Sequence, residues 1–418
     1  LERLAKANWM FDQRYPADAA QRQPVHSVYG GAHRFKSDTA AKLGAIALDT
    51  FAKYLPDPAA LACVTAMDAR TAEAVHPRVR AKLEREPIED FRIDFEDGYG
   101  CHTGEEEDAH ALESALQTAR GMRAASLPPF IGIRIKPLAS ALWPRAMRTL
   151  DIYLTHLLEN TGAPPANFVV TLPKVTSPAQ PAALHAMLDQ IEARFNLPPR
   201  TLRIELMMEA PQLIVDEHGV CAIPALIDAC NGRCRGLHFG PYDYTTAVGI
   251  PGSHQSLHHP SCDFARHMMQ SAVAGTRIQL SDGPTKTLPI PPHRGQLTEQ
   301  QQAANRDVVH HAMRVHYDDV RRSLHHGYYQ GWDLHPAQFP MRYAAVYSFF
   351  LEGLDRAVVE AERRQERPVS ATSSTPPRKP PPSAPPSTTP PPRRASSTSF
   401  CKDTLAAPSP PPNSLNPA

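Results

Sequence analysis

Short apolar runs recur along the chain, and most of them are followed by a stretch with helical periodicity. Eight of these runs are short enough for strands and rich in β-branched and aromatic residues. They are Val25–Tyr29, Phe91–Glu96, Phe130–Lys136, Phe168–Pro173, Leu202–Met208, Gly236–Phe239, Thr276–Leu280 and Trp332–His335. From the second run to the seventh, successive runs start roughly 34–40 residues apart, enough for a strand, a helix and two loops. This alternation predicts an α/β fold, a (β/α)8 TIM barrel with insertions.

The longer gaps between the runs contain helical patterns with recognisable ends. The segments Asp38–Tyr54 and Ala74–Glu86 fill the first gap. A capping box from Thr298 to Gln301 begins a long helix, and Gly327 ends it. A doubly wound sheet is the competing arrangement. It is less favoured because no Gly-x-Gly-x-x-Gly loop joins a strand to a helix.

Alternation within the runs separates charged from apolar positions. Arg92, Asp94 and Glu96 alternate with Phe91, Ile93 and Phe95, and Arg134 and Lys136 alternate with three isoleucines. Near the end of the chain, Trp332 and Leu334 alternate with Asp333 and His335 in the same way. We expect the apolar faces to contact the helices and the charged faces to line a polar upper lumen. An antiparallel sheet with one face in water would need hairpin turns, which are missing at that spacing.

Composition narrows the classes of partner. The chain has 44 Lys and Arg against 43 Asp and Glu, a formal net charge of +1. This balance argues against nucleic acid and membrane surfaces as partners. No apolar run approaches the roughly 20 residues of a membrane span. Seven cysteines without a Cys-x-x-Cys pair indicate reduced thiols and a cytoplasmic location. Organelle targeting stays open, because the sequence begins at Leu1 without a methionine.

The last part of the chain differs from the rest. Residues 368–418 hold 16 of the 44 prolines, one aromatic residue and no glycine. Such a segment buries too little apolar surface to offset its ordering entropy, so we expect a disordered tail. The expected organisation is an N-terminal extension over residues 1–24, a barrel domain over 25–360 and this tail.

Charged residues gather where the predicted strands end, which is where a TIM barrel carries its reacting groups. They are His33, Arg34, Asp94, Glu96, Asp97, Arg134, Lys136, Lys174, Glu205, Glu209, Asp243, Asp282 and His335. Converging carboxylates repel one another, so a divalent cation among them is expected. Oxygen ligands with few thiols or imidazoles favour Mg²⁺, with Mn²⁺ as the alternative. Arg134 and Lys136 could then hold an anionic substrate, arginine being the better bidentate partner of a carboxylate.

Several of these residues also have structural interpretations, which stay open at this point. Glu205 lies deeper on the face of Glu209 and is expected to be a buried partner. Asp94 can pair with Arg92 or with a lysine of a neighbouring strand, and Asp282 precedes a glycine, as turn residues do. Three histidines in a Pro/Gly/Ser-rich loop are expected to face solvent or substrate: His254, His258 and His259.

Six motifs at these strand ends resemble, in the same order, those of the HpcH/HpaI aldolase and citrate lyase β-subunit family of the pyruvate kinase-like barrel group. They are Ile93–Gly98, Ile133–Pro137, Leu172–Val175, Met208–Ala210, Phe239–Tyr244 and Gly331–Gln338. The resemblance extends from about Val25 to Phe350. It departs from the family pattern at Tyr29–His33, at Lys136 in place of an asparagine, and in the insertion 283–330. These departures affect the substrate, including whether a CoA thioester is used.

The resemblance implies a metal-dependent carbon–carbon lyase or aldolase. Such an enzyme acts on a 2-oxo acid adduct or an acyl-CoA through an enolate that Mg²⁺ stabilises. Glu209 and Asp243 match the metal ligands of the family. Arg134 would stabilise the enolate oxygen, and the proton would be handled by His33 or by a water held by Glu96 or Asp97. The residues expected to bind substrate are Arg134, Lys136, Lys174 and His335. The resemblance also implies a homo-oligomer, a trimer or a hexamer.

Two other functions stay open. Related barrels handle phosphoenolpyruvate, so phosphoryl transfer or C–O chemistry at the same metal is one alternative. A non-catalytic scaffold is the other, with the tail as its working part. Pro380–Pro382 and Pro390–Pro392 could present polyproline helices to SH3-like or WW-like domains. The converging acids argue against a scaffold.

Overall fold

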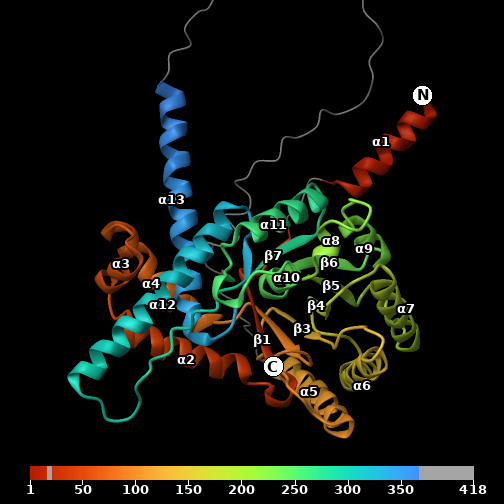
Figure 1. The fold of residues 1–418 in the computed structure, drawn as a ribbon, viewed down its shortest axis with the longest axis horizontal. Coiled ribbons are helices and arrows are strands. Elements are labelled where there is room, and N and C mark those ends of the chain that lie inside the picture. Colours follow the sequence, from red (N-terminus) through yellow and green to blue (C-terminus); the bar gives the residue numbers. More distant parts are fainter. Residues whose placement is uncertain (17–20, 367–418) are drawn as a thin grey trace, which may run out of the picture.

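The chain folds around a closed barrel of eight parallel strands in the order β1 to β8 (Figure 1). The computed structural model describes residues 1–16 and 21–366. The strands are β1 (His26–Gly31), β2 (Asp90–Asp94), β3 (Phe130–Arg134), β4 (Phe168–Leu172), β5 (Arg203–Met208), β6 (Cys234–Phe239), β7 (Gln279–Pro284) and β8 (Gln330–Asp333). The predicted TIM barrel is therefore confirmed. The expected disordered tail lies outside the described residues.

Helices surround the barrel and follow most of its strands. They are α1 (Glu2–Arg14), α2 (Thr39–Tyr54), α3 (Pro58–Thr65), α4 (Ala69–Arg85), α5 (Gly104–Ala124), α6 (Trp143–Thr161), α7 (Ala179–Arg194), α8 (Pro211–Ile214), α9 (Ile223–Ala229), α10 (Pro241–Ala247), α11 (Pro260–Val273), α12 (Glu299–His325) and α13 (Phe339–Glu366). The helices predicted at 38–54 and 74–86 correspond to α2 and α4. The predicted capping box between Thr298 and Gln301 does begin α12.

Strand β7 lies later in the chain than the sequence analysis predicted. The strand runs from Gln279 to Pro284 rather than over Thr276–Leu280, and its pairing with β8 shifts register between Ser281 and Pro284. Its second half contains Gly283, where an added Cβ would lie 2.3 Å from Pro241 Cδ. Glycine and proline normally argue against a strand interior, and this strand uses them at an irregularity beside another loop.

Charged side chains fill the middle of the barrel lumen, as the alternation in β2 predicted. Arg92 pairs with Asp90, and its Nη2 lies 2.6 Å from Glu205 Oε2. Glu205 also lies 3.0 Å from Nε2 of His238, and all four residues are buried. Burial alone would raise the pKa of Glu205, but Arg92 and His238 outweigh it and hold the pKa well below its usual range. Glu205 is thus a buried partner, as expected, and it ties β2 to β5 and β6 across the lumen.

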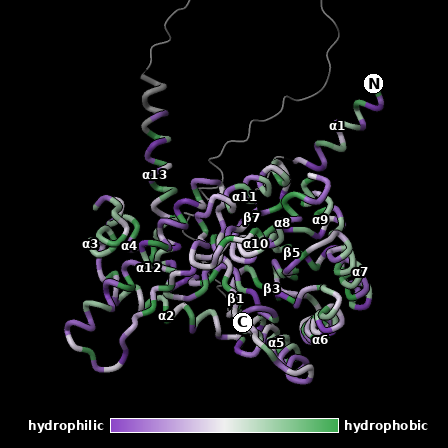
Figure 2. Tube along the Cα trace, in the orientation of Figure 1, coloured by the Kyte–Doolittle hydropathy of each residue, from purple (hydrophilic) through white to green (hydrophobic). Residues whose placement is uncertain are grey.

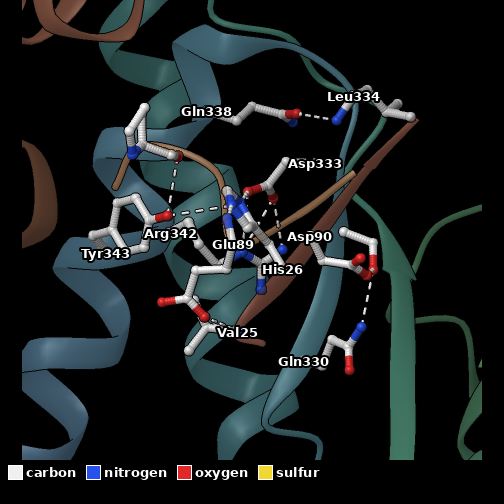
Figure 3. Close-up of polar contacts among 12 residues, drawn as sticks. Val25, His26, Glu89, Asp90, Gln330, Asp333, Leu334, Gln338, Arg342 and Tyr343 are labelled. Carbon is white, nitrogen blue, oxygen red and sulfur yellow. Dashed lines mark hydrogen bonds and ion pairs between the residues drawn. The ribbon is translucent and has the colours of Figure 1, made fainter. Parts of the chain in front are cut away.

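The seam between β8 and β1 is closed by a buried carboxylate, Asp333, on the outer face of the barrel (Figure 3). Nδ1 of His26 lies 2.7 Å from Asp333 Oδ2, and Arg342 of α13 donates two hydrogen bonds to Oδ1, at 3.1 and 2.7 Å. His316 of α12 lies 3.2 Å from the same oxygen. Asp333 therefore points toward the helices, and Trp332 lies on the lumen side. This is the reverse of the alternation expected for this strand.

Helix α1 projects away from the barrel (Figure 1) and has no buried residues. Hydrophobic and hydrophilic positions are interspersed along it (Figure 2), and Leu4, Trp9 and Phe11 are exposed. Its last residue, Arg14, lies 3.2 Å from Asp228. Within residues 1–16 and 21–366, no helix is both long enough and apolar enough to cross a membrane. The six cysteines in this part of the chain are all free thiols.

Candidate active site

Four carboxylates meet around one lysine at the carboxyl ends of the strands. Glu96 and Asp97 follow β2, Glu209 follows β5, and Asp243 lies in the first turn of α10. Nζ of Lys174, two residues beyond β4, lies 2.6 Å from Asp243 Oδ2 and 3.7 Å from Glu209 Oε2. It lies 3.4 Å from the nearest carboxylate oxygen of each of the other two acids. The structure therefore brings together five residues that the sequence analysis proposed for the site.

Local backbone geometry produces this convergence. Lys174 has a positive φ of 49°, an uncommon conformation for a residue with a side chain. Its backbone N–H donates to Glu209 Oε2 at 3.0 Å. On the other side of Glu209, a Cβ added at Gly240 would lie 2.4 Å from Glu209 Cγ. Gly240 is therefore required so that β6 can approach this carboxylate.

Burial makes the site electrostatically unbalanced. Glu209 is only 4 % exposed, and burial, together with the nearby charges of Asp243 and Glu96, raises its pKa to about 7. Burial, assisted by Asp97, also raises the pKa of Glu96, although Arg134 opposes the shift. Burial alone would lower the pKa of Lys174, but Glu209 and the other acids outweigh it and raise the pKa. The carboxylates are thus short of positive charge, and Lys174 stays protonated.

The donor set fits a hard divalent cation. Among the described residues, no group of three or more His, Cys, Asp and Glu side chains is arranged to hold a metal ion. A site for Zn²⁺ normally needs such a group, whereas Mg²⁺ is commonly held by one or two carboxylates with waters and substrate. Glu209 and Asp243 both lie near one cation, the ammonium of Lys174. The carboxylates of Glu209 and Asp243 thus offer two converging oxygen donors in a cluster with more negative than positive charge, which fits Mg²⁺ or Mn²⁺.

Arg134 lies beside this cluster and is 1 % exposed. Its Nε and Nη2 donate to the two oxygens of Asp94 at 2.7 and 2.6 Å. The remaining nitrogen, Nη1, lies 3.0 Å from Glu96 Oε2. Asp94 thus pairs with Arg134 and not with Arg92. The bidentate face of Arg134 is already used, so a substrate would meet Nη1 alone.

Two aromatic residues near Arg134 were missed by the sequence analysis. The Arg134 guanidinium lies 4.7 Å from the ring centroid of Tyr29 and 5.5 Å from that of Trp332. In the part of the chain that the structure describes, the Tyr29 hydroxyl and Trp332 Nε1 are buried without a hydrogen-bond partner. Unpaired buried polar groups are costly, so each calls for an explanation such as a catalytic role or a bound water or ligand. No signal in the sequence pointed to Trp332, because the alternation in its strand predicted that this side chain faces the helices.

Two of the proposed residues lie in a different cluster. The ring of His33 packs against those of His102 and His110, with centroids 5.2 and 6.0 Å apart. Lys136 Nζ lies 3.1 Å from Glu107 and donates to the backbone oxygen of Phe95 at 2.9 Å. The structure does not bring His33 or Lys136 into contact with the four carboxylates. Their catalytic and substrate-binding roles stay predictions.

The remaining candidates have structural contacts. His335 Nδ1 accepts from the backbone N–H of Ala337 at 3.1 Å and caps a short 3₁₀ turn. Asp282 is buried, lies 3.2 Å from Arg266 and accepts a hydrogen bond from Ser323 at 2.6 Å, so it is more than a turn residue. His258, expected in a solvated or substrate-facing loop, lies 2.7 Å from Asp319 of α12.

Solved structures with a similar chain path include two metal complexes. One is Haloferax volcanii malate synthase in a magnesium and glyoxylate complex, with 14 % identity, a TM-score of 0.46, and coverage of 82 % of this chain and 94 % of that one. The other is the Mycobacterium tuberculosis citrate lyase β subunit with oxaloacetate and magnesium, at 15 % identity and a TM-score of 0.43. The match covers 79 % of this chain and 99 % of the citrate lyase chain. At these values the similarity says nothing about activity.

No curated protein matches the sequence significantly. A family model does match, and it covers residues 4–374, which is most of the chain. The resemblance to the HpcH/HpaI family, which rests on the strand-end motifs, remains a prediction beside this match. The chain therefore belongs to the family described as a domain of unknown function, DUF6986.

Proposed function

We propose that this protein is a Mg²⁺-dependent carbon–carbon lyase or aldolase that acts on a 2-oxo acid adduct or an acyl-CoA. The observation that carries the proposal is the convergence of Glu209 and Asp243 on one cationic position beside the buried guanidinium of Arg134. The strand-end motifs that resemble the aldolase and citrate lyase family support the same reaction class. Mn²⁺ is the alternative metal.

Glu209 and Asp243 would hold the metal. When bound, the metal would act as a Lewis acid that polarises the keto oxygen of the substrate. Arg134 would stabilise negative charge that develops on the same oxygen through Nη1, the nitrogen that is not bonded to Asp94 and that lies 3.0 Å from Glu96 Oε2. A donor fixed in a buried site needs no reorganisation when that charge appears. Asp94 would therefore act as a positioning residue for Arg134.

Glu96 is the candidate that the geometry favours for handling the proton. Its Oε2 atom lies 3.0 Å from Nη1 of Arg134, and its pKa is raised, chiefly by burial, although Arg134 opposes the shift. A carboxylate with a raised pKa is a better general base near neutral pH than an ordinary one. His33, the other candidate for this role, lies in the separate histidine cluster.

The test is cleavage of 4-hydroxy-2-oxo acids and of 3-hydroxyacyl-CoA thioesters, measured with Mg²⁺ and with EDTA. We expect turnover to require the metal and to fall by roughly 10³-fold or more in Glu209→Gln and in Asp243→Asn, because each substitution removes a ligand charge. Glu217→Gln is the matched control, since that side chain is 87 % exposed. Unchanged turnover in both site variants would contradict the assignment.

A further inference from the structure

Lys174 holds a position that the proposed chemistry does not explain. Its ammonium lies within 4 Å of all four site carboxylates, with the shortest contact to Asp243. A lysine that bound substrate would be expected to point away from the metal ligands, toward the open mouth of the barrel. We infer that Lys174 is a built-in competitor of the divalent cation, so that metal binding must displace its ammonium from Glu209 and Asp243.

Lys174 contacts Glu209 through both its backbone and its side chain. Its backbone N–H is bonded to Glu209 Oε2, and its side chain returns to the same cluster through Nζ. Both contacts come from one residue, whose φ of 49° lies in the left-handed region. Such a conformation persists in a residue with a side chain only when its surroundings hold it there. The backbone therefore places the start of the Lys174 side chain beside Glu209, within reach of all four carboxylates.

Charge and size make the ammonium a substitute for the metal. It carries one positive charge and donates up to three hydrogen bonds, and it is a compact point charge on a flexible stem. The stem lets it leave without movement of the backbone N–H that holds Glu209. A divalent cation brings twice the charge to the same oxygens, and like charges a few ångströms apart repel each other, most of all beside the buried carboxylate of Glu209. The two cations therefore exclude each other.

Competition of this kind sets the affinity for the metal. This inference rests on the proposed function, because it assigns the metal to Glu209 and Asp243. Apparent affinity is reduced by the fraction of molecules in which the competing group occupies the site. The wild-type protein should bind the metal more weakly than its two acidic ligands would allow. The same lysine would limit the repulsion among the acids whenever the metal leaves.

The experiment is titration of the full chain with Mn²⁺, with the free ion measured by electron paramagnetic resonance. Lys174→Met removes the charge at similar size, Lys174→Gln keeps a neutral donor, and Lys174→Arg keeps the charge. The matched control is Lys286→Met, because Lys286 is exposed and its Nζ lies over the ring of Tyr242 at 4.7 Å, next to Asp243 in sequence. Glu209→Gln removes one of the proposed ligands, so the Mn²⁺ binding that this variant loses belongs to this site.

We expect Lys174→Met and Lys174→Gln to bind Mn²⁺ at least about tenfold more tightly than the wild type, within the usual range of coupling between two sites. Lys174→Arg and Lys286→Met should stay within about threefold of the wild type. Equal or weaker binding in the Met variant or, if that variant does not fold, in the Gln variant overturns the inference. So does binding in none of the proteins.

Cleavage assays on the same preparations separate the two proposals. Tighter Mn²⁺ binding in the lysine variants, without cleavage of any 2-oxo acid adduct or acyl-CoA by the wild type, would support the competitor role and reject the proposed reaction. Metal-dependent cleavage by the wild type, with unchanged Mn²⁺ affinity in the lysine variants, would support the proposed reaction and reject the competitor role.

Discussion

The aromatic pair next to Arg134 belongs to the residue scale and has a direct test. Tyr29 places a buried hydroxyl that has no hydrogen-bond partner in the described residues. Tyr29→Phe removes this hydroxyl and keeps the ring that stacks on Arg134. Because no internal hydrogen bond is lost, we expect an unchanged or slightly higher midpoint of thermal unfolding. We expect KM to rise several-fold, because the hydroxyl would donate to the substrate. An unchanged KM with a lower unfolding temperature would show that the hydroxyl is structural.

Glu209 gives a prediction about pH at the same scale. Its pKa in the folded protein is about 7, well above the value of 4.5 for an unperturbed glutamate. Between these two values the folded chain binds more protons than the unfolded chain, so stability falls as the pH rises. In EDTA, we expect the wild type to lose roughly 3 kcal/mol of unfolding free energy relative to Glu209→Gln between pH 4.5 and pH 7. Urea unfolding at several pH values measures this difference, and parallel curves for the two proteins would contradict it.

Sequence motifs identified the residues of the carboxylate cluster, but not how each side chain is used. The direction of Lys174 depends on a left-handed backbone, which the residue type gives no reason to expect. The pairing of Asp94 with Arg134 instead of Arg92 depends on the register between β2 and β3, which places these two residues side by side. Contacts of this kind join segments far apart in the chain, so they follow from the fold and not from local pattern.

At the scale of elements, Asp333 holds the barrel closed. Burial alone would raise its pKa, but Arg342 and His316 outweigh burial and hold the pKa far below its usual range. Asp333→Asn removes the charge and leaves Arg342 buried without its counter-ion. We expect a loss of about 3–5 kcal/mol of unfolding free energy, measured by urea unfolding. Asp151→Asn is the control, because that side chain is 54 % exposed and should change stability by under about 0.5 kcal/mol. Similar losses in both variants would contradict this role.

The two strands that differed from expectation share a cause. In β8, a charged residue faces the helices because α12 and α13 supply His316 and Arg342 to meet it. In β7, Asp282 is tolerated inside the strand because Arg266 of α11 lies 3.2 Å away. A pattern of apolar and polar positions assigns charges to water or to the lumen. It cannot anticipate a buried partner on a helix outside the barrel.

At the scale of the whole molecule, the order and number of strands followed from the spacing of the apolar runs. Seven of the eight strands lie within a few residues of their predicted places, because each buried run must alternate with a covering helix. The sequence analysis missed helix α3 because this helix is short. It occupies only Pro58–Thr65, within a gap where two other helices had been expected. Overall architecture is thus set by burial, and the site by contacts that the architecture then allows.

Helix α1 gives a prediction at this scale. None of its residues is buried, and Arg14 makes its ion pair with an exposed Asp228. Exposed pairs of this kind contribute about 1 kcal/mol or less. Deletion of residues 1–14 should therefore shift the midpoint of thermal unfolding by no more than a few degrees, measured by calorimetry, with Mn²⁺ affinity unchanged. A large drop in stability would show that α1 packs against the barrel or against a second copy.

The central claim is that Glu209 and Asp243 hold a metal that allows a 2-oxo acid to lose a proton next to its keto group. The most direct measurement is exchange of the methyl protons of pyruvate in deuterated water, followed by NMR. We predict exchange with Mg²⁺ or Mn²⁺, none above background with EDTA, and none in Glu209→Gln or Asp243→Asn, while Glu217→Gln exchanges like the wild type. Exchange that persists in EDTA and in both site variants, or that never exceeds background in the wild type with either metal, would contradict the account.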